Sequence, residues 1–182
     1  ACARSVVADH GGRFPDTEAG LRTLPGVGPY TAAAVAAIAF GAHATVVDGN
    51  VERVVARLYA VETPMPAAKP TLQALAAELT PAQRCGDYAQ AMMDLGATIC
   101  TPRSPDCAAC PVASGCVALK LQTPTRFPVK AAKVARPTRQ GTIYWLRAGD
   151  AVLVTLRPPR GLLGGMRSLP SDDWATVRPA HA

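Results

Sequence analysis

Four of the six cysteines in this sequence lie close together, at Cys100, Cys107, Cys110 and Cys116. Their spacing, C-x6-C-x2-C-x5-C, brings four soft sulfur ligands into one short segment. Because the sequence shows no signal-peptide pattern, this grouping indicates a metal centre rather than a pair of disulfides. Thiolates suit either zinc or an iron–sulfur cluster. Zinc sites usually combine two separate C-x2-C pairs, whereas this segment has one pair between two single cysteines, which favours a cluster.

A second stretch suited to chemistry is LPGVG at 24–28, which predicts a tight turn. Its two glycines permit positive φ and leave no Cβ in the way of an approaching group. Pro29 follows, at a position that the first turn of a helix tolerates. A glycine turn that opens a helix presents free N–H groups and the positive end of the helix dipole, which bind phosphate. Taken alone, these five residues favour a plain connection between two helices.

Helices must position both stretches. Residues 31–40 are apolar and rich in alanine, which predicts a helix buried on every side, and Gly41 ends it. Residues 51–59 predict the next helix. Its apolar face consists of Val51, Val54, Val55 and Leu58. We expect the charged residues of this helix to face outward, namely Glu52, Arg53 and Arg57.

Further helices are predicted on both sides of this pair. Asp16 or Thr17 caps a short helix that runs through Leu21. Thr71 caps a later helix, and residues 86–99 form another one. Nothing before about residue 120 requires a strand, so this part of the chain is predicted to be all-α.

The last third of the chain differs in charge and in pattern. Residues 1–119 carry 8 Lys and Arg against 10 Asp and Glu, whereas residues 120–182 carry 11 against 3. A basic segment is a suitable partner for a polyanion, although a solvated tail has the same composition. Residues 123–140 predict a linker, and 142–147 and 151–157 predict strands joined by a short hairpin. No apolar run is long enough to span a bilayer.

Taken together, the motifs resemble the helix-hairpin-helix DNA glycosylases. The matching features are LPGVG-x-[YK]-TA, a buried helix, an apolar run that ends in VDGNV, and the cysteine spacing. The resemblance implies a mainly α fold, with a helix-hairpin-helix glycosylase core and an iron–sulfur loop, then a basic linker and an incomplete α/β Nudix-like domain. In chain order these parts are a partial six-helix domain with the hairpin at 1–47, a helical iron–sulfur cluster domain at 48–122, the linker at 123–140 and the truncated Nudix-like domain at 141–182.

The resemblance also implies roles for individual residues. The hairpin holds a DNA phosphate through Gly26, Val27 and Gly28. The four cysteines hold a [4Fe–4S] cluster that shapes the loop around Arg103 for contact with DNA. Asp48 is catalytic, because its carboxylate stabilises positive charge on the sugar when a flipped-out base departs, and Asn50 supports it. From the residues alone, Asp48 and Asn50 are also typical of helix caps.

Tyr30 indicates the subclass. In family members that also cut the DNA strand, a lysine at this position forms a Schiff base with the sugar, which tyrosine cannot do. The resemblance therefore implies a monofunctional enzyme with Tyr30 among its catalytic residues, although a packed aromatic at the hairpin rim fits as well. The segments TIYWLR, AVLVTLRPP, GLLGGM-x-x-LP and QAMMDLG resemble the MutY-type adenine glycosylases, which act on adenine mispaired with 8-oxoguanine or guanine. The alternatives are a thymine–guanine mismatch glycosylase and a non-catalytic DNA-binding module with a structural cluster.

The sequence departs from the MutY-type pattern at the general acid. That group carries a catalytic glutamate, which protonates adenine, in an early segment rich in Gln and Thr. The four glutamates of this chain stand in other contexts, at Glu18, Glu52, Glu62 and Glu78. We therefore expect a fragment with little or no base excision by itself. The expected partner is double-stranded DNA with an A·8-oxoguanine or A·G mispair, with no membrane. The chain is expected to act as a monomer in the bacterial cytoplasm, associated with the nucleoid.

Overall fold

The computed structural model describes residues 1–132 and 138–175. Residues 133–137 of the predicted linker and residues 176–182 of the predicted Nudix-like domain lie outside this described part. Among the described residues, no helix is long and apolar enough to cross a membrane.

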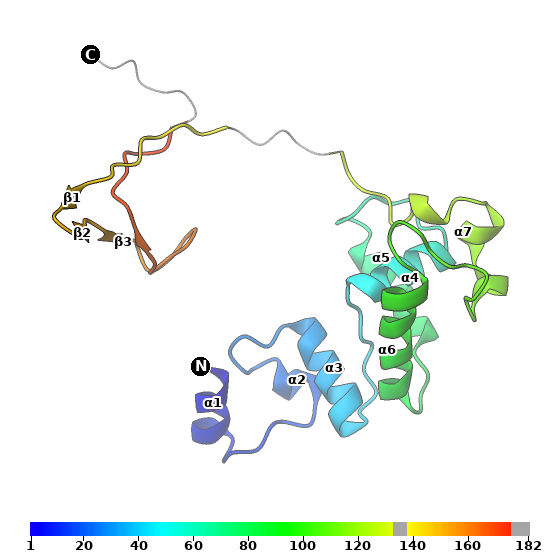
Figure 1. The fold of residues 1–182 in the computed structure, drawn as a ribbon. Helices are drawn as coiled ribbons and strands as arrows, with labels where there is room; N and C mark the ends of the chain where they lie inside the picture. The colour runs from blue at the N-terminus through cyan, green and yellow to red at the C-terminus, as the bar shows by residue number, and fades with distance from the viewer. Residues whose placement is uncertain (133–137, 176–182) are drawn as a thin grey trace. The chain divides into compact units, whose positions relative to one another are not determined.

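The chain divides into two compact units, Ala1–Ala132 and Lys133–Ala182. The first unit is helical, as predicted, and its elements can be followed in chain order in Figure 1. Its α-helices are α1 (Cys2–Asp9), α2 (Glu18–Leu21), α3 (Pro29–Phe40), α4 (Gly49–Leu58), α5 (Lys69–Leu79), α6 (Cys85–Asp94) and α7 (Val117–Lys120). Shorter helical turns are η1 (Leu95–Ile99), η2 (Ala113–Gly115) and η3 (Pro124–Arg126).

Helix α3 begins after the glycine turn and ends at Gly41, whose φ of 64° is the left-handed conformation that favours glycine. The prediction that this helix is buried on every side is wrong. Four alanines are buried, but Ile38 and Phe40 are each 44% exposed. The small alanine side chains allow α6 to approach closely, because a Cβ on Gly86 would lie 2.5 Å from the carbonyl oxygen of Ala37. The alanines of α3 therefore form one face that packs closely against α6.

Helix α4 confirms its predicted position and most of its apolar face. Its buried valines are Val51, Val54 and Val55. The prediction that its charged residues face outward is wrong for Arg57, which is only 2% exposed. Arg53 is half-buried, and Glu52 forms an ion pair with Lys69 of α5 at 3.1 Å. The cause is that the cysteine-rich segment (residues 100–116) packs near the end of α4, which periodicity along one helix cannot reveal.

Two of the predicted caps have different outcomes. Thr17 caps α2, because its hydroxyl accepts the backbone N–H of Gly20 at 3.2 Å. The prediction that Thr71 caps the later helix is wrong. Helix α5 begins at Lys69, with Pro70 in the first turn where proline is favoured, so Thr71 already lies inside the helix.

The predicted helix at 86–99 forms as α6 and continues into the π-helical segment η1. This wider segment brings Gly96 against the start of α4, where a Cβ on Gly96 would lie 2.6 Å from the Cβ of Asn50. The carbonyl oxygen of Gly96 accepts Nη2 of Arg53 at 2.6 Å. Segment η1 thus supports the beginning of α4 directly.

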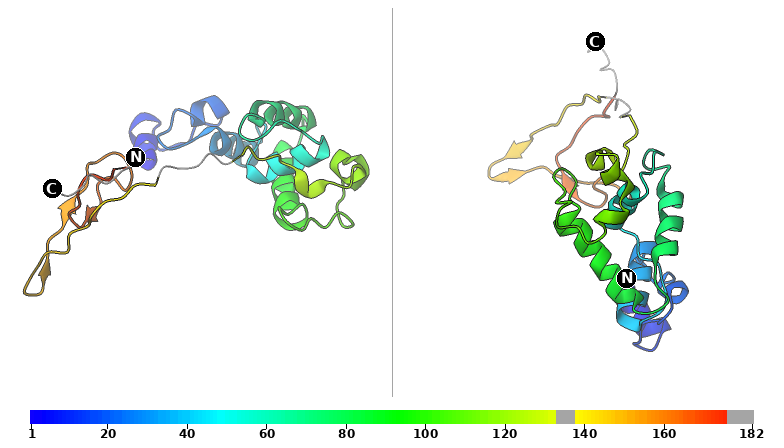
Figure 2. Two further views of the ribbon diagram at one scale, coloured as in Figure 1. Left: turned by 90° about the horizontal axis from the view of Figure 1, so that it is seen from above. Right: turned by 90° about the vertical axis from the view of Figure 1, so that its right-hand side faces the viewer.

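Two apolar clusters hold the first unit together. One combines α1, α2 and α3 with Cys85 and Ala89 of α6, and the other combines α4, α5 and α7 with Met92 of α6 and Leu95 of η1. Helix α6 therefore belongs to both clusters, and Figures 1 and 2 show it beside α3 and against α4. The glycine turn and the cysteine-rich segment are positioned through this shared helix.

The second unit consists of short antiparallel pairs. They are β1 (Arg147–Ala148) with β2 (Ala151–Val152), and β3 (Thr155–Leu156) with β4 (Arg167–Ser168). The first pair confirms the predicted hairpin. The predicted strand at 142–147 is only partly formed, as an isolated antiparallel bridge between Ile143 and Ser171 and as the first residue of β1, and the one at 151–157 is split in two. Each strand pairs with one other strand over only two residues, and an isolated two-stranded pair is only marginally stable.

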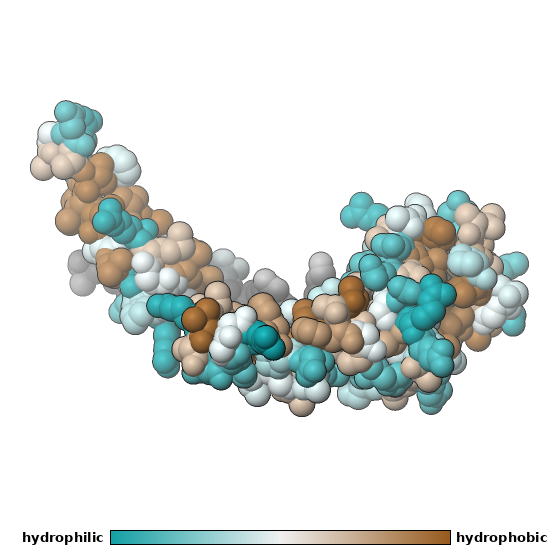
Figure 3. Space-filling view, turned by 90° about the horizontal axis from the view of Figure 1, so that it is seen from below, coloured by the Kyte–Doolittle hydropathy of each residue, from teal (hydrophilic) through white to brown (hydrophobic). Residues whose placement is uncertain are grey.

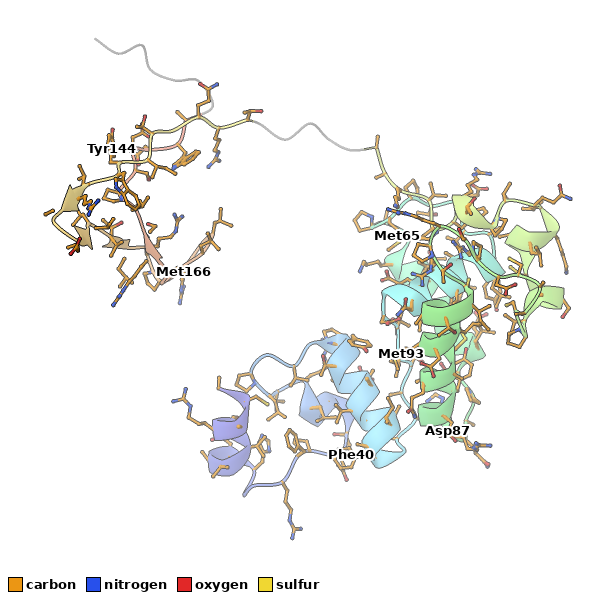
Figure 4. All side chains as sticks on the ribbon, in the orientation of Figure 1. Phe40, Met65, Asp87, Met93, Tyr144 and Met166 are labelled. Atoms are coloured by element: carbon orange, nitrogen blue, oxygen red, sulfur yellow. The ribbon has the colours of Figure 1, made fainter. Side chains whose placement is uncertain are left out.

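Large apolar side chains of the second unit remain exposed. Trp145 is 66% exposed, Leu156 73% and Leu162 81%. Figure 3 shows apolar residues, coloured brown, on the face of the molecule that it presents. Tyr144 and Met166 of this unit are labelled in Figure 4, and they are 45% and 54% exposed.

Candidate functional site

Asp48 precedes α4 and accepts hydrogen bonds at both carboxylate oxygens. Its Oδ1 accepts the backbone N–H groups of Asn50 at 2.8 Å and Val51 at 2.7 Å, which caps the helix. Its Oδ2 accepts the side-chain amide of Asn50 at 3.2 Å. The positive end of the α4 dipole favours the negative charge of this half-buried side chain. The cap that the sequence allows is therefore present, and it fixes the direction of the carboxylate.

Asn50 continues a chain of hydrogen bonds towards the cysteine-rich segment. Its Oδ1 accepts Nη2 of Arg53 at 2.8 Å. Nε of Arg53 donates to the backbone carbonyl of Cys100 at 2.8 Å. Burial lowers the pKa of Arg53, and the neighbouring charge of Arg57 lowers it further. Through Asn50 and Arg53, the carboxylate of Asp48 is thus connected to the backbone of the first cysteine.

The four predicted metal ligands line one small cavity. Among the described residues, no group of three or more His, Cys, Asp or Glu side chains is placed to hold a single metal ion. Four thiolates around one Zn²⁺, at Zn–S distances of about 2.3 Å, would lie only about 3.8 Å apart. A cluster of several irons needs a wider space between the sulfurs. Four cysteine side chains around one cavity are a donor set that suits an iron–sulfur cluster.

Arg57 lines the same cavity and is a residue that the sequence prediction missed. Its Nη1 donates to the carbonyl oxygens of Thr101 at 2.8 Å and Cys100 at 3.1 Å. Its Nη2 donates to Pro102 at 3.1 Å, and its Nε donates to Phe127 at 3.1 Å. Nη1 also lies 3.2 Å from Sγ of Cys100. In the described chain no carboxylate pairs with this buried guanidinium, so backbone carbonyls and the sulfur of Cys100 are its acceptors.

Burial and the other three cysteines of this cavity disfavour ionisation of the Cys107 thiol. Burial raises the pKa of the Cys107 thiol, and the three other cysteines raise it further. Thiolates gathered in this way repel one another until positive charge binds among them. Together with the buried cation of Arg57, this donor set fits an anionic iron–sulfur centre held by Cys100, Cys107, Cys110 and Cys116.

The glycine turn leaves the start of α3 open. Gly26 has a φ of 85°, and the N–H of Val27 donates to the carbonyl of Leu24 at 3.1 Å. Gly28 has extended backbone and stands at the N-cap position, where no side chain caps the helix. The glycines and Tyr30 are exposed. The first N–H groups of α3 are consequently accessible, as an anion-binding helix start requires.

Tyr30 and Arg103 lie in different parts of the first unit. Tyr30 is 44% exposed, and its hydroxyl lies 3.5 Å from Sδ of Met93. Met93, which is labelled in Figure 4, belongs to α6, so this contact joins the start of α3 to α6. Arg103 is exposed within the cysteine-rich segment, at the edge of a surface hollow.

The structure brings some of the predicted residues together and leaves others apart. Arg53 links Asn50, and through it Asp48, to the cysteine-rich segment. Among the described residues, no hydrogen bond joins the glycine turn to Asp48. One signal could have revealed the two arginines: they stand four positions apart on the helix that follows Asp48, and thiolates around a metal centre need nearby cations.

Comparison with known proteins agrees with these features. Residues 9–38 match the family described as "Helix-hairpin-helix motif", and residues 100–116 match the "Iron-sulfur binding domain of endonuclease III". An adenine DNA glycosylase from Arabidopsis thaliana is 38% identical over 93% of this chain, which spans 29% of that relative. A thymine/uracil-DNA glycosylase from Methanothermobacter thermautotrophicus is 40% identical over 63% of this chain and 52% of its own length.

The fold also resembles a solved structure. A non-covalent complex of endonuclease III with DNA matches with a TM-score of 0.55 and 28% sequence identity, over 65% of this chain and 55% of that one. The predicted mainly helical fold with a hairpin motif and an iron–sulfur loop is thereby confirmed. The chain spans only part of the length of its curated relatives, which are DNA glycosylases, and it carries a helix-hairpin-helix motif and a segment that matches the iron–sulfur binding domain of endonuclease III.

Proposed function

We propose that the chain is part of a DNA repair glycosylase that removes adenine mispaired with 8-oxoguanine or guanine. The observation that carries this proposal is the carboxylate of Asp48, oriented by three hydrogen bonds at the start of α4. A carboxylate has about four acceptor positions, so one lone pair remains for a substrate. The adenine DNA glycosylase relative, which matches 93% of the chain, supports adenine as the base.

In this proposal the target base leaves the stack, and the sugar acquires positive charge as the glycosidic bond breaks. Asp48 stabilises that charge through its ionised carboxylate, which the helix cap holds in one direction. The side-chain amide of Asn50 donates to this carboxylate and is itself held by Arg53, so it keeps the carboxylate in place. Tyr30 lines the start of α3 and cannot form a Schiff base, so water adds to the sugar cation, loses a proton and leaves an abasic site. The hairpin residues Gly26 to Gly28 hold a phosphate of the same strand.

Adenine needs a proton to leave, and this chain has four glutamates that could supply one. Two of them are engaged in ion pairs, Glu52 with Lys69 and Glu62 with Arg126. Glu18 lies in the first turn of α2 and Glu78 near the end of α5. None stands in the Asp48 hydrogen-bond chain, so we propose that residues 1–182 alone release little adenine.

The cofactor in this proposal is a [4Fe–4S] cluster on the four cysteines. When bound, it would supply a rigid anchor for the loop. The protein contributes the cavity and the guanidinium of Arg57, which holds three backbone carbonyls of the loop. The loop is thereby held in a single conformation, in which Arg103 contacts DNA.

A test that does not need the general acid uses duplexes in which a cationic pyrrolidine replaces the target sugar, with a neutral abasic analogue as the comparison. The affinity of residues 1–182 is measured for the wild type and for Asp48→Asn, a substitution that keeps the side-chain shape. We expect Asp48→Asn to weaken binding of the cationic duplex at least tenfold and to leave binding of the neutral one unchanged. Equal loss on both duplexes would refute a charge-stabilising role.

The opposing base tests the substrate. We expect the cationic analogue to bind most tightly opposite 8-oxoguanine, less tightly opposite guanine and weakly opposite thymine. A preference for guanine over 8-oxoguanine would instead favour a mismatch enzyme of the thymine type, the second candidate, which the 40% identity to a thymine/uracil-DNA glycosylase supports. Robust adenine release from an A·8-oxoguanine duplex by residues 1–182 would refute the proposed lack of a general acid.

A further inference from the structure

A surface hollow of about 620 Å³ lies where the cysteine-rich segment meets the chain that leaves the first unit. It is lined by Thr101, Pro102, Arg103, Ser104 and Lys130. Its volume lies within the range of roughly 300–1,000 Å³ that is typical of ligand sites. The hollow therefore has room for a stretch of polymer backbone and not only for a single small ion.

Arg57 donates hydrogen bonds to the backbone of both chain segments that line this hollow or lead to it. On one side, its guanidinium donates to the carbonyl oxygens of Thr101 and Pro102, directly before Arg103. On the other side, its Nε donates to the carbonyl of Phe127, which is 1% exposed and starts the segment that leads to Lys130. One buried side chain thus sets the distance between two segments that are more than twenty residues apart in sequence.

The segment that carries Lys130 has a second anchor. The N–H of Met65 donates to the carbonyl of Val129 at 2.8 Å, and Met65 forms an isolated parallel β-bridge with Lys130. Met65, labelled in Figure 4, lies near the point where the chain leaves the first unit. The backbone that leads to Lys130 is consequently anchored at Phe127 and at Val129, although the side chain of Lys130 is exposed.

The two cations at this hollow are available for a ligand. In the part of the chain that the structure describes, neither Arg103 nor Lys130 takes part in an ion pair or a side-chain hydrogen bond. Nearby Arg126, by contrast, is engaged with Glu62. Arginine and lysine are the side chains that bind phosphate oxygens, and no acidic residue lines the hollow.

We propose that Arg103 and Lys130 together bind the phosphodiester backbone of DNA, so that the DNA-binding surface extends beyond the cysteine-rich segment onto the chain that follows it. This inference rests on the proposed function and adds a second contact segment to it. Each cation neutralises one phosphate and displaces its counterions. The site carries no sequence preference, since backbone contacts position DNA without reading bases.

The experiment measures the affinity of residues 1–182 for a fluorescent duplex at several salt concentrations. We expect Lys130→Ala and Arg103→Ala each to lower the slope of log K against log [salt] by about 0.9, and the double variant by about twice that value. The loss should be the same for matched and mispaired duplexes. The control is Lys120→Ala, which removes the same charge from an exposed position at the end of α7 that does not line the hollow.

Helical content and iron per chain are measured for each variant, so that a folding defect is recognised. If Lys130→Ala behaves like Lys120→Ala while the wild type binds DNA, the contribution of Lys130 is refuted and the proposed function stands. If the wild type shows no salt-dependent binding to any duplex, both proposals fail. A loss that appears only with mispaired DNA would also contradict a backbone contact.

Discussion

At the scale of single residues, Arg57 holds several backbone segments together through hydrogen bonds. Its guanidinium is buried and donates to four backbone carbonyls and one cysteine sulfur. Carbonyls that point into the interior without a donor each cost about 1–3 kcal/mol. Lysine retains the charge, but it has a single nitrogen and lacks the rigid fork that reaches several acceptors at once.

We predict that Arg57→Lys lowers the free energy of unfolding by about 3 kcal/mol and reduces the iron content per chain. Urea denaturation followed by circular dichroism, with an iron assay of the same preparation, measures both quantities. Arg126→Lys is the matched control, because Arg126 is exposed and its ion pair with Glu62 lies at the surface. Equal midpoints for the two variants would show that the buried hydrogen bonds are not needed.

The same residue shows where prediction from sequence reaches its limit. Helical periodicity correctly placed Val51, Val54 and Val55 in the core, and it wrongly placed Arg57 at the surface. The apolar stripe of a helix is a local pattern, whereas the burial of Arg57 depends on carbonyls at 100–102 and 127 that pack against it. The caps at Thr17 and Asp48 were predictable, because a cap involves only the next three residues.

At the scale of elements, the contact between α3 and α6 connects the two apolar clusters of the first unit. The helices come close because α3 presents alanines and α6 presents Gly86. An alanine at this position would gain up to about 1 kcal/mol from helix propensity. Its Cβ would, however, meet the backbone oxygen of Ala37 at 2.5 Å, and backbone atoms cannot move aside as a flexible side chain can.

We therefore expect Gly86→Ala to destabilise the protein by about 1–2 kcal/mol, since overpacking costs about 1–3 kcal/mol and outweighs the gain in propensity. Thermal unfolding followed by circular dichroism measures the change. Gly115→Ala serves as the control, because the nearest atom to its added Cβ is Cδ1 of Leu58 at 4.0 Å. A Gly86→Ala variant as stable as the wild type would mean that α3 and α6 separate without loss.

At the scale of the whole molecule, stability is divided among the two clusters of the first unit and the small second unit. Cys100, Cys110 and Cys116 pack against the cluster formed by α4, α5 and α7, and not against the one around α3. A metal centre on these cysteines should therefore stabilise one part of the chain selectively.

We predict that iron removal by a chelator abolishes hydrogen-exchange protection from Ile99 to Phe127 and weakens that of α4. Protection of α3 should remain, because its alanines pack on α2 and α6 rather than on the cysteine-rich segment. Exchange followed by mass spectrometry resolves these segments, and Cys107→Ser should reproduce the effect without a chelator. An equal loss of protection in α3 would show that the two clusters unfold as one unit.

The helical class, the glycine turn, the cap at Asp48 and the grouping of the four cysteines all follow from the local sequence, and the structure confirms that these cysteines line one cavity. Each depends on residue types at short spacing, where backbone conformation and metal preference act locally. Tertiary packing, by contrast, buries Arg57, connects Asn50 to Cys100 through Arg53, and places Lys130 at the same hollow as Arg103. These features require segments far apart in the chain to pack together. A local sequence pattern does not specify which distant carbonyl or cation a residue will contact.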